Sequence, residues 1–311
     1  MQKIIITEFM HLPAVEELKA RYQVHYDPEL VDKPQELADR IRGADALIVR
    51  NRTRVDSALL EQAGPQLKVV GRLGVGMERI DLEACALRDV QVIPATGSNT
   101  NAVAEYVITG VLMLLRGAYQ CSAEVLSGSW PRQKYMGHDS SGKTLGIIGF
   151  GAIGRCTADK AGALGLRVLA CDAYVAKDDP AWARHGASPA SLDALLEQSQ
   201  AVSLNVPLTP ETHHLIGSSE IARMPRGAVI INSCRGGVVD ETALCAALDS
   251  GHLAGALLDV YEQEPLAANS GLTGVPNLIL TPHIAGVSHE SNQCIGEMIA
   301  QGVAAALRNE I

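Results

Sequence analysis

The chain has 311 residues, of which 47% are hydrophobic, 20% are charged and 4% are aromatic, and its formal net charge is -9. This length is enough for two domains with buried cores, and the composition excludes a disordered chain. An acidic chain without a basic block is a poor partner for phosphate backbones, so we expect no nucleic-acid partner. The scarcity of aromatic side chains also disfavours single-strand binding by base stacking.

Cysteine usage and hydropathy point to a cytoplasmic protein. The seven cysteines are odd in number, widely scattered and without a CxxC pair, so we expect reduced thiols and neither a zinc site nor a disulfide framework. His213 and His214 are adjacent but lack a third ligand, and no metal site is predicted. The apolar run from Tyr106 to Leu115 is shorter than the roughly 20 residues that span a bilayer, so we expect no membrane partner.

Short β-branched runs alternate with helical patterns along the first hundred residues. The runs predict strands at 4–6, 24–26, 46–49, 68–72 and 90–93. The helical patterns lie between them, at 13–21, 34–43, 55–64 and 81–89. A long helix is expected at 100–116, followed by a polar connection at 127–143.

The same alternation then begins again. Strands are expected at 144–149, 167–172, 201–206, 228–233, 254–260 and 277–282, with a helix ending near 164 and a final helix over 291–307. Strands that alternate with helices indicate parallel sheets covered on both faces. We therefore predict an α/β fold with two doubly wound parallel-sheet domains, and we expect the final helix to pack back on the first.

A glycine pattern marks a dinucleotide site. Gly149, Gly151 and Gly154 form a GxGxxG sequence that follows a predicted strand and opens a predicted helix. The first glycine permits the tight turn, the second allows the backbone to approach a pyrophosphate, and the third allows close packing of helix on strand. The diphosphate would then lie at the positive end of the helix dipole.

Asp172 ends the strand that follows this helix. A carboxylate there would accept hydrogen bonds from the ribose hydroxyls of adenosine and would repel a 2′-phosphate. The next residues, Ala173, Tyr174 and Val175, supply no arginine to neutralise such a phosphate. NAD is therefore the predicted cofactor, in preference to NADP.

Three later segments each end a predicted strand with a chemically active side chain, namely Arg235, Glu264 and His283. Open parallel sheets bind ligands at the carboxyl ends of their strands. An arginine fork binds a substrate carboxylate and polarises the adjacent carbonyl, whereas an imidazole exchanges protons near neutrality. A neighbouring carboxylate favours the imidazolium, although Glu262 competes with Glu264 for that role.

These motifs resemble those of the D-isomer-specific 2-hydroxyacid dehydrogenases, in the short form of the 3-phosphoglycerate dehydrogenase type that has no regulatory domain. The similarity spans nearly the whole chain. In the family's order it includes GRLGVGMERIDL, SNTNAVAEYV, LGIIGFGAIGR, NVPLTPET, INSCRGGVVD, GALLDVYEQEPL and TPHIAG. Feedback through an appended regulatory domain is therefore not expected.

The resemblance implies a domain organisation and an assembly. A Rossmann NAD-binding domain, residues 99–285, would be inserted into a flavodoxin-like substrate domain, residues 1–98 and 286–311. The resemblance also implies a homodimer, for which Ile221, Met224 and the apolar helix from Tyr106 are candidate contacts.

The resemblance also implies roles for individual residues. Arg235, Glu264 and His283 match the catalytic triad. The matched substrate-binding positions are Arg52, Val75, Gly76, Asn99, Arg235 and His283. The matched cofactor-binding positions are Val103, Gly149, Gly151, Ala152, Ile153, Gly154, Asp172, Val206, Pro207, Thr212, Ser233, Cys234, Asp259, His283 and Gly286, with Asp259 contacting the nicotinamide.

One departure from the family pattern bears on the substrate. Glu78 and Arg79 stand where the family commonly has Asp-Asn, so an additional arginine lies near Arg52 in the expected pocket. Two arginines favour a 2-hydroxy acid with a second anionic group, of the 3-phosphoglycerate or 3-sulfolactate type. A hydroxypyruvate or glyoxylate reductase is the alternative enzyme, and an NAD-sensing, corepressor-like binding protein is the alternative of another class.

Overall fold

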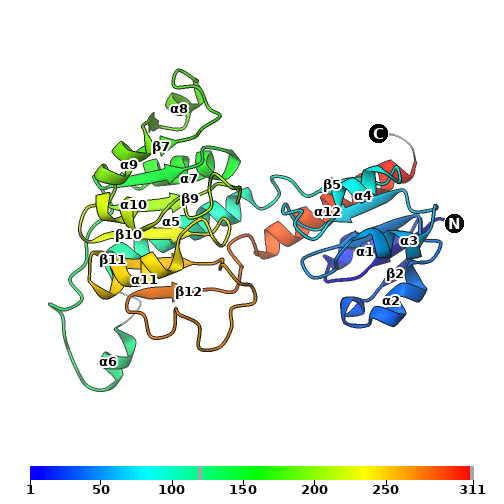
Figure 1. The fold of residues 1–311 in the computed structure, drawn as a ribbon, viewed down its shortest axis with the longest axis horizontal. Coiled ribbons are helices and arrows are strands. Elements are labelled where there is room, and N and C mark those ends of the chain that lie inside the picture. Colours follow the sequence, from blue (N-terminus) through cyan, green and yellow to red (C-terminus); the bar gives the residue numbers. More distant parts are fainter. Residues whose placement is uncertain (118–120, 309–311) are drawn as a thin grey trace. The chain divides into compact units, whose positions relative to one another are not determined.

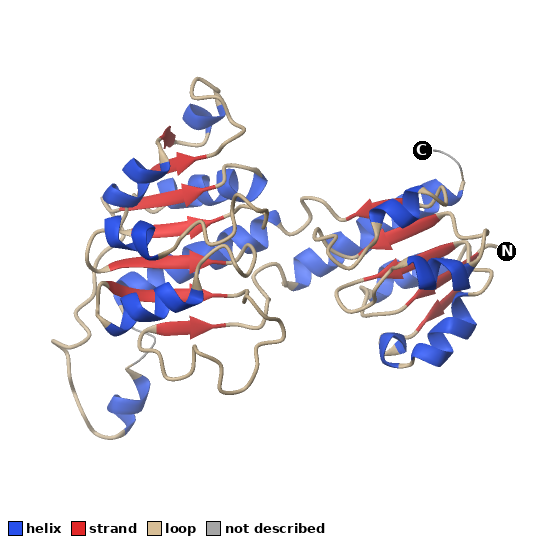
Figure 2. Ribbon diagram, in the orientation of Figure 1, coloured by secondary structure: helices blue, strands red, loops and turns tan. Residues whose placement is uncertain are grey.

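The computed structural model describes residues 1–117 and 121–308. The chain forms two compact units, one of Met1–Asn99 together with the segment from Val287, and one of Thr100–Gly286. Each unit contains one parallel sheet with helices on both faces (Figure 2). The prediction of two doubly wound α/β sheets is therefore confirmed.

The first unit has a five-stranded sheet in the order β2-β1-β3-β4-β5. Its strands are β1 (Lys3–Ile6), β2 (Gln23–Tyr26), β3 (Ala46–Val49), β4 (Val69–Arg72) and β5 (Gln91–Pro94). Its helices are α1 (Leu12–Lys19), η1 (Leu30–Asp32), α2 (Pro34–Ile41), α3 (Ser57–Ala63), α4 (Leu82–Ala86) and α12 (His289–Leu307). Successive side chains of a strand point to opposite faces, so Ile4 and Ile6 pack in one core and Ile5 in the other.

Helix α12 packs on this sheet although it lies at the far end of the sequence. It is the red helix among the blue and cyan elements of Figure 1. Gly71 of β4 explains the close approach, because a Cβ atom there would lie 2.7 Å from Cγ2 of Ile299. The amphipathic pattern of α12 thus buries Ile295, Ile299 and Val303 against the first unit.

The second unit has a seven-stranded sheet in the order β12-β11-β10-β9-β6-β7-β8. Its strands are β6 (Thr144–Ile148), β7 (Arg167–Cys171), β8 (Ala187–Pro189), β9 (Ala201–Leu204), β10 (Ala228–Asn232), β11 (Leu253–Leu258) and β12 (Leu278–Leu280). Its helices are α5 (Thr100–Arg116), α6 (Ser122–Leu126), α7 (Ala152–Ala163), α8 (Ala181–Arg184), α9 (Leu192–Gln198), α10 (Ser218–Arg223) and α11 (Glu241–Asp249). The strand order reverses between β6 and β9, which is where such sheets bind their ligands.

Ile221 and Met224 are only 3% and 2% exposed within the core of the second unit, so the expectation that they make dimer contacts is wrong. They point inward because α10 packs on α9 and α11.

No helix in the described part of the chain combines the length and the apolar character needed to cross a membrane.

Candidate functional site

His283, Glu264 and Tyr261 are linked at the carboxyl edge of the second sheet. Nδ1 of His283 lies 2.8 Å from Oε2 of Glu264, and the other carboxylate oxygen accepts a hydrogen bond from the backbone N–H of Tyr261 at 3.1 Å. His283 adopts a φ of 56°, a conformation that residues other than glycine rarely take. With Nδ1 engaged by the carboxylate, Nε2 is the ring nitrogen that remains to exchange a proton.

Glu262 points to a different partner. Its Oε1 lies 3.1 Å from Nε2 of His214 and accepts a weak hydrogen bond from the backbone of Glu241. Of the two glutamates that the sequence offered, only Glu264 therefore contacts His283.

Asp259 is fully buried and holds the segment that carries His283. Its Oδ1 accepts hydrogen bonds from the Thr281 hydroxyl at 2.6 Å and from the Ile284 N–H at 2.7 Å. Its Oδ2 accepts one from the Ala285 N–H at 2.7 Å. Tyr106 of α5 also hydrogen-bonds Thr281, and burial raises the pKa of this phenol. Asp259 therefore fixes the turn after β12 from within the sheet edge.

The Arg235 segment is brought against the Glu264 segment by a glycine. Gly236 lies so close to Tyr261 that a Cβ atom would overlap the Tyr261 carbonyl oxygen at 1.7 Å. Asn232 closes the turn by donating to the Arg235 carbonyl at 3.0 Å and accepting from the Cys234 N–H at 3.2 Å. The turns after β10 and β11 are therefore packed together, which the Gly236-Gly237 pair in the sequence would have signalled.

The three fingerprint glycines differ in what surrounds them. Gly149 has a φ of 93°, and a Cβ atom there would meet the Asn205 carbonyl oxygen at 2.4 Å. At Gly154 a Cβ atom would meet the Gly149 carbonyl oxygen at 2.2 Å, whereas at Gly151 it would meet nothing within 4 Å. The first and third glycines are thus required by packing, and the second leaves open space at the start of α7.

Asp172 is oriented by the same turn. Its Oδ2 accepts a hydrogen bond from the Phe150 N–H at 2.7 Å, and its Oδ1 accepts one from the Tyr174 N–H at 2.8 Å. It also lines a pocket of about 170 Å³ with Val175, Lys177 and neighbouring residues. The carboxylate at the end of β7 is therefore held beside the glycine turn, where a ribose would be recognised.

The other residues proposed for the cofactor lie in the same unit. Thr212 donates to the Pro207 carbonyl at 2.6 Å and accepts from the Thr209 N–H, so it shapes the loop after β9. Oγ of Ser233 is buried without a hydrogen-bond partner among the described residues. Buried hydroxyl groups normally have such a partner, so this one fits a group that hydrogen-bonds a ligand. Cys234 is partly buried, and desolvation raises the pKa of its thiol.

The residues proposed to bind the cofactor range from exposed to buried. Gly151 and Ala152 are exposed, Val206 lies against Gly149, and Val103 and Ile153 pack in the core behind the sheet, where Val103 is only 5% exposed. Three features fit a bound NAD: the open space at Gly151, the placement of Asp172 and the Ser233 hydroxyl without a partner among the described residues.

The first unit carries basic side chains on the turn after β3. Arg52 pairs with Asp32 through both guanidinium Nη atoms, one of them at 2.9 Å. Arg50 donates to Oδ1 of Asn292 at 2.7 Å and lies over the ring of Phe9. Arg52 and Asp32 are both more than half exposed.

Arg72 joins that turn to the next one. Its Nη2 donates to Oδ1 of Asn51 at 3.0 Å, and its Nε donates to the Gly76 carbonyl at 2.9 Å. At Gly74 a Cβ atom would lie 2.5 Å from Nη1 of Arg72. The guanidinium therefore lies beneath the Gly74–Gly76 turn, and Val75 is left 41% exposed. The role of Arg72 in linking the two turns was not predicted, although its place at the end of a buried strand was a signal.

Arg79 and Asn99 are placed differently. Arg79 is exposed, and its backbone carbonyl accepts a hydrogen bond from the Val55 N–H at 2.8 Å, next to the Arg50–Arg54 segment. A bridge between Val55 and Ile80 joins the two basic segments. Asn99 is the last residue of the first unit before α5.

Comparison with known proteins decides the family. Residues 108–285 match the model of the D-isomer specific 2-hydroxyacid dehydrogenase, NAD binding domain. The chain belongs to the D-isomer specific 2-hydroxyacid dehydrogenase family. It is an oxidoreductase that uses NAD to interconvert a 2-hydroxy acid and its 2-keto acid.

Relatives of the dehydrogenase differ in their substrates. It is 51% identical over 307 residues to the (S)-sulfolactate dehydrogenase of Chromohalobacter salexigens, covering 99% of each chain. It is 36% identical over 311 residues to the D-3-phosphoglycerate dehydrogenase of Methanocaldococcus jannaschii, covering all of this chain and 58% of that protein. The structure of a glyoxylate reductase from Paecilomyes thermophila is similar with a TM-score of 0.86 and 30% identity, covering 99% of this chain and 96% of the other.

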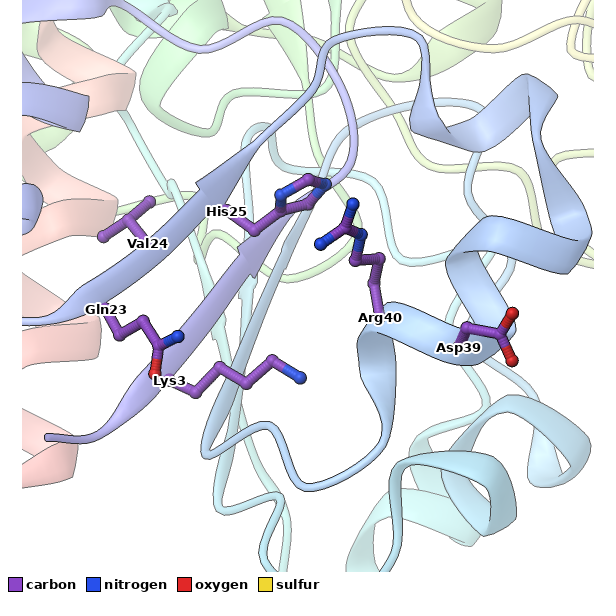
Figure 3. Close-up of a pocket in the computed structure, with 6 residues that line it drawn as sticks. All are labelled: Lys3, Gln23, Val24, His25, Asp39 and Arg40. Atoms are coloured by element: carbon purple, nitrogen blue, oxygen red, sulfur yellow. The ribbon is translucent and has the colours of Figure 1, made fainter.

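A further pocket of the dehydrogenase contains none of the residues proposed to bind the substrate or the cofactor. It has a volume of about 310 Å³ and is lined by Lys3, Gln23, Val24, His25, Asp39 and Arg40. In Figure 3 the Arg40 guanidinium points toward His25, the Lys3 ammonium points into the space between its strand and the helix that carries Arg40, and Asp39 points away. Lys3 donates to the Arg42 carbonyl and Arg40 pairs with Glu36, so both cations already have partners.

Proposed function

We propose that this dehydrogenase acts on a 2-hydroxy acid that carries a second anionic group, and that the substrate is 3-sulfolactate or a close analogue such as 3-phosphoglycerate. Two observations carry this proposal: the arginines on the turn after β3 and at the end of β4, and the 51% identity to (S)-sulfolactate dehydrogenase. Sulfonate and phosphate both accept two parallel hydrogen bonds from a guanidinium.

We assign recognition of the substrate to both units. In the first, Arg52 would bind the second anionic group, Val75 and Gly76 would offer backbone N–H groups to the carboxylate, and Asn99 would contribute a polar contact. In the second, Arg235 would hold the carboxylate and polarise the reacting carbonyl. Residues 1–98 and 286–311 are accordingly proposed as the substrate domain, and residues 99–285 as the NAD-binding domain.

We assign proton exchange to His283. During oxidation Nε2 would accept the proton of the substrate hydroxyl, and during reduction the imidazolium would return it to the forming alkoxide. Glu264 would keep the ring in the orientation seen here and stabilise its charged form. Bound NAD supplies the hydride acceptor.

The cofactor contacts are part of the same proposal. The glycine turn from Gly149 to Gly154 would hold the diphosphate, and Asp172 would hold the adenosine ribose. The remaining contacts are assigned to Val103, Val206, Pro207, Thr212, Ser233, Cys234, Asp259 and Gly286.

We also propose that the protein is a homodimer in the cytoplasm. Leu126 at the end of α6 is 89% exposed, and in the segment that follows it Trp130 is 76% and Met136 is 80% exposed. Large apolar side chains exposed to water favour burial against a partner. Sedimentation equilibrium tests this, since a monomer has a mass of 32.9 kDa. A monomer at micromolar concentration would refute the dimer.

Substrate specificity is tested by a panel of acids. NAD-dependent oxidation of both enantiomers of sulfolactate, of 3-phosphoglycerate, glycerate, lactate and glycolate is followed by the absorbance of the reduced nicotinamide. We expect kcat/KM to be at least tenfold higher for the doubly charged acids. Equal or better turnover of glycolate and glycerate would support the glyoxylate or hydroxypyruvate reductase. Absence of turnover, with NAD-dependent binding to another protein, would support a corepressor-like role.

A further inference from the structure

Glu8 is a buried carboxylate that organises the arginine turn of the first unit. It follows β1, is 5% exposed, and accepts four backbone hydrogen bonds. Its Oε1 accepts from the N–H groups of Arg50 and Thr53, both at 2.9 Å. Its Oε2 accepts from Asn51 at 3.0 Å and from Arg52 at 2.9 Å. One side chain therefore satisfies every backbone donor of residues 50–53.

The charge of Glu8 is stabilised by these contacts. Burial raises the pKa of the carboxyl, but the hydrogen bonds from Thr53, Arg50 and Arg52 outweigh burial and leave the pKa below its usual value. A carboxylate with four N–H donors is fully solvated by the protein. Four backbone hydrogen bonds thus keep Glu8 ionised at neutral pH.

Two further contacts extend the effect of Glu8. The hydroxyl groups of Thr7 and Thr53, both buried, hydrogen-bond at 2.7 Å and fix the end of the turn. Asn51, held by Glu8 through its backbone, accepts from Arg72, which in turn donates to Gly76. Glu8 therefore holds residues 50–53 directly, whereas it reaches the Gly74–Gly76 turn only indirectly, through Asn51 and Arg72.

We propose that Glu8 is a positioning residue for the second anionic group of the substrate, acting by holding residues 50–53 so that Arg52 presents its guanidinium. This inference rests on the proposed function. Glu8 is too deeply buried to touch a ligand, so its effect passes through the turn. A glutamine would replace one acceptor oxygen by an N–H₂ group, and the two donors that it faces would lose their acceptor.

The test compares Glu8→Gln with wild type in the full-length protein at saturating NAD. We expect KM for sulfolactate to rise about tenfold, with kcat and the KM for glycerate changed less than threefold. Hydrogen exchange of the amides of residues 50–53 should accelerate. Glu17→Gln, at an exposed position on α1 of the same unit, is the control and should leave all three readouts unchanged.

The outcomes separate this inference from the proposed function. If wild type does not prefer doubly charged acids, the proposed substrate class fails, while amide exchange still reports on Glu8. If wild type prefers them but Glu8→Gln raises both KM values equally or lowers only kcat, the role of Glu8 is overturned. Glu8→Asp, which keeps the charge, covers the case in which the glutamine variant does not fold. It should show the same selective rise in KM, and a uniform loss of activity would overturn the proposal.

Discussion

Nδ1 of His283 lies 2.8 Å from Oε2 of Glu264, in a segment whose backbone is held by the buried Asp259. The contact with Glu264 at Nδ1 orients the imidazole ring and leaves Nε2 to exchange a proton with the substrate. Two turns from different strands, after β11 and β12, supply the pair, and the parallel sheet brings them to one edge.

Replacement of Glu264 by glutamine should lower kcat for keto acid reduction by about 100-fold, because the imidazolium loses its carboxylate partner. Steady-state rates of keto acid reduction at neutral pH measure the effect. Glu262→Gln is the control, since Glu262 pairs with His214 instead. Equal losses in the two variants would contradict the assignment of Glu264.

Arg235→Lys should reduce kcat/KM on the order of 100-fold, because one ammonium cannot reproduce the two parallel donors of a guanidinium. NAD affinity, measured by fluorescence titration, should stay within about twofold. Arg226→Lys, at an exposed arginine of the same unit, should behave as wild type. Near-normal turnover by Arg235→Lys would exclude the proposed role of this residue.

Asp172→Asn should reduce the preference for NAD over NADP by tenfold or more, since hydrogen bonds to a charged group contribute about 1.5–3 kcal/mol. The ratio of kcat/KM for the two cofactors is the measurement. Asp178→Asn, an exposed change six positions later, is the matched control. An unchanged ratio would show that discrimination lies elsewhere.

Asp32→Asn should lower KM for a doubly charged substrate by about threefold. Asp32 occupies both Nη atoms of Arg52 in this structure and therefore competes with a substrate anion, and an exposed ion pair of this kind is weak because water and salt screen it. Asp39→Asn, which removes an exposed partner of Arg42, should have no effect on KM. A raised KM in Asp32→Asn would mean that Asp32 positions Arg52 and does not compete for it.

Glu8 should also contribute to stability in a pH-dependent way. Its pKa is lowered in the folded protein, so its contribution is present above the pKa of an unfolded glutamate and is lost as the pH falls through the folded value. Chemical denaturation should show Glu8→Gln to be less stable than wild type by about 1–3 kcal/mol at pH 7. The difference should shrink below about pH 4. A difference that is independent of pH would show that the charge of Glu8 is not involved.

Residues that act locally were predictable from the sequence. The glycines from Gly149 to Gly154 and the strand before them form a turn within one short segment, and their spacing carries the whole signal. The alternation of β-branched runs with helices likewise predicted both parallel sheets, because burial on both faces requires continuous apolar strands. The short helices α8, α9, α10 and α11 were not predicted, although α2, α3 and α4, which are of similar length, were.

Only the tertiary structure decided which partner each polar side chain has. Glu264 rather than Glu262 contacts His283, Asp32 pairs with Arg52, and Glu8 binds a turn more than forty positions away. Composition described an acidic chain of two domains, and motif order indicated an NAD-dependent oxidoreductase. Hydrogen bonds require distances near 3 Å between atoms that lie far apart in the sequence, so their partners are set by the packing of the sheets and not by local pattern.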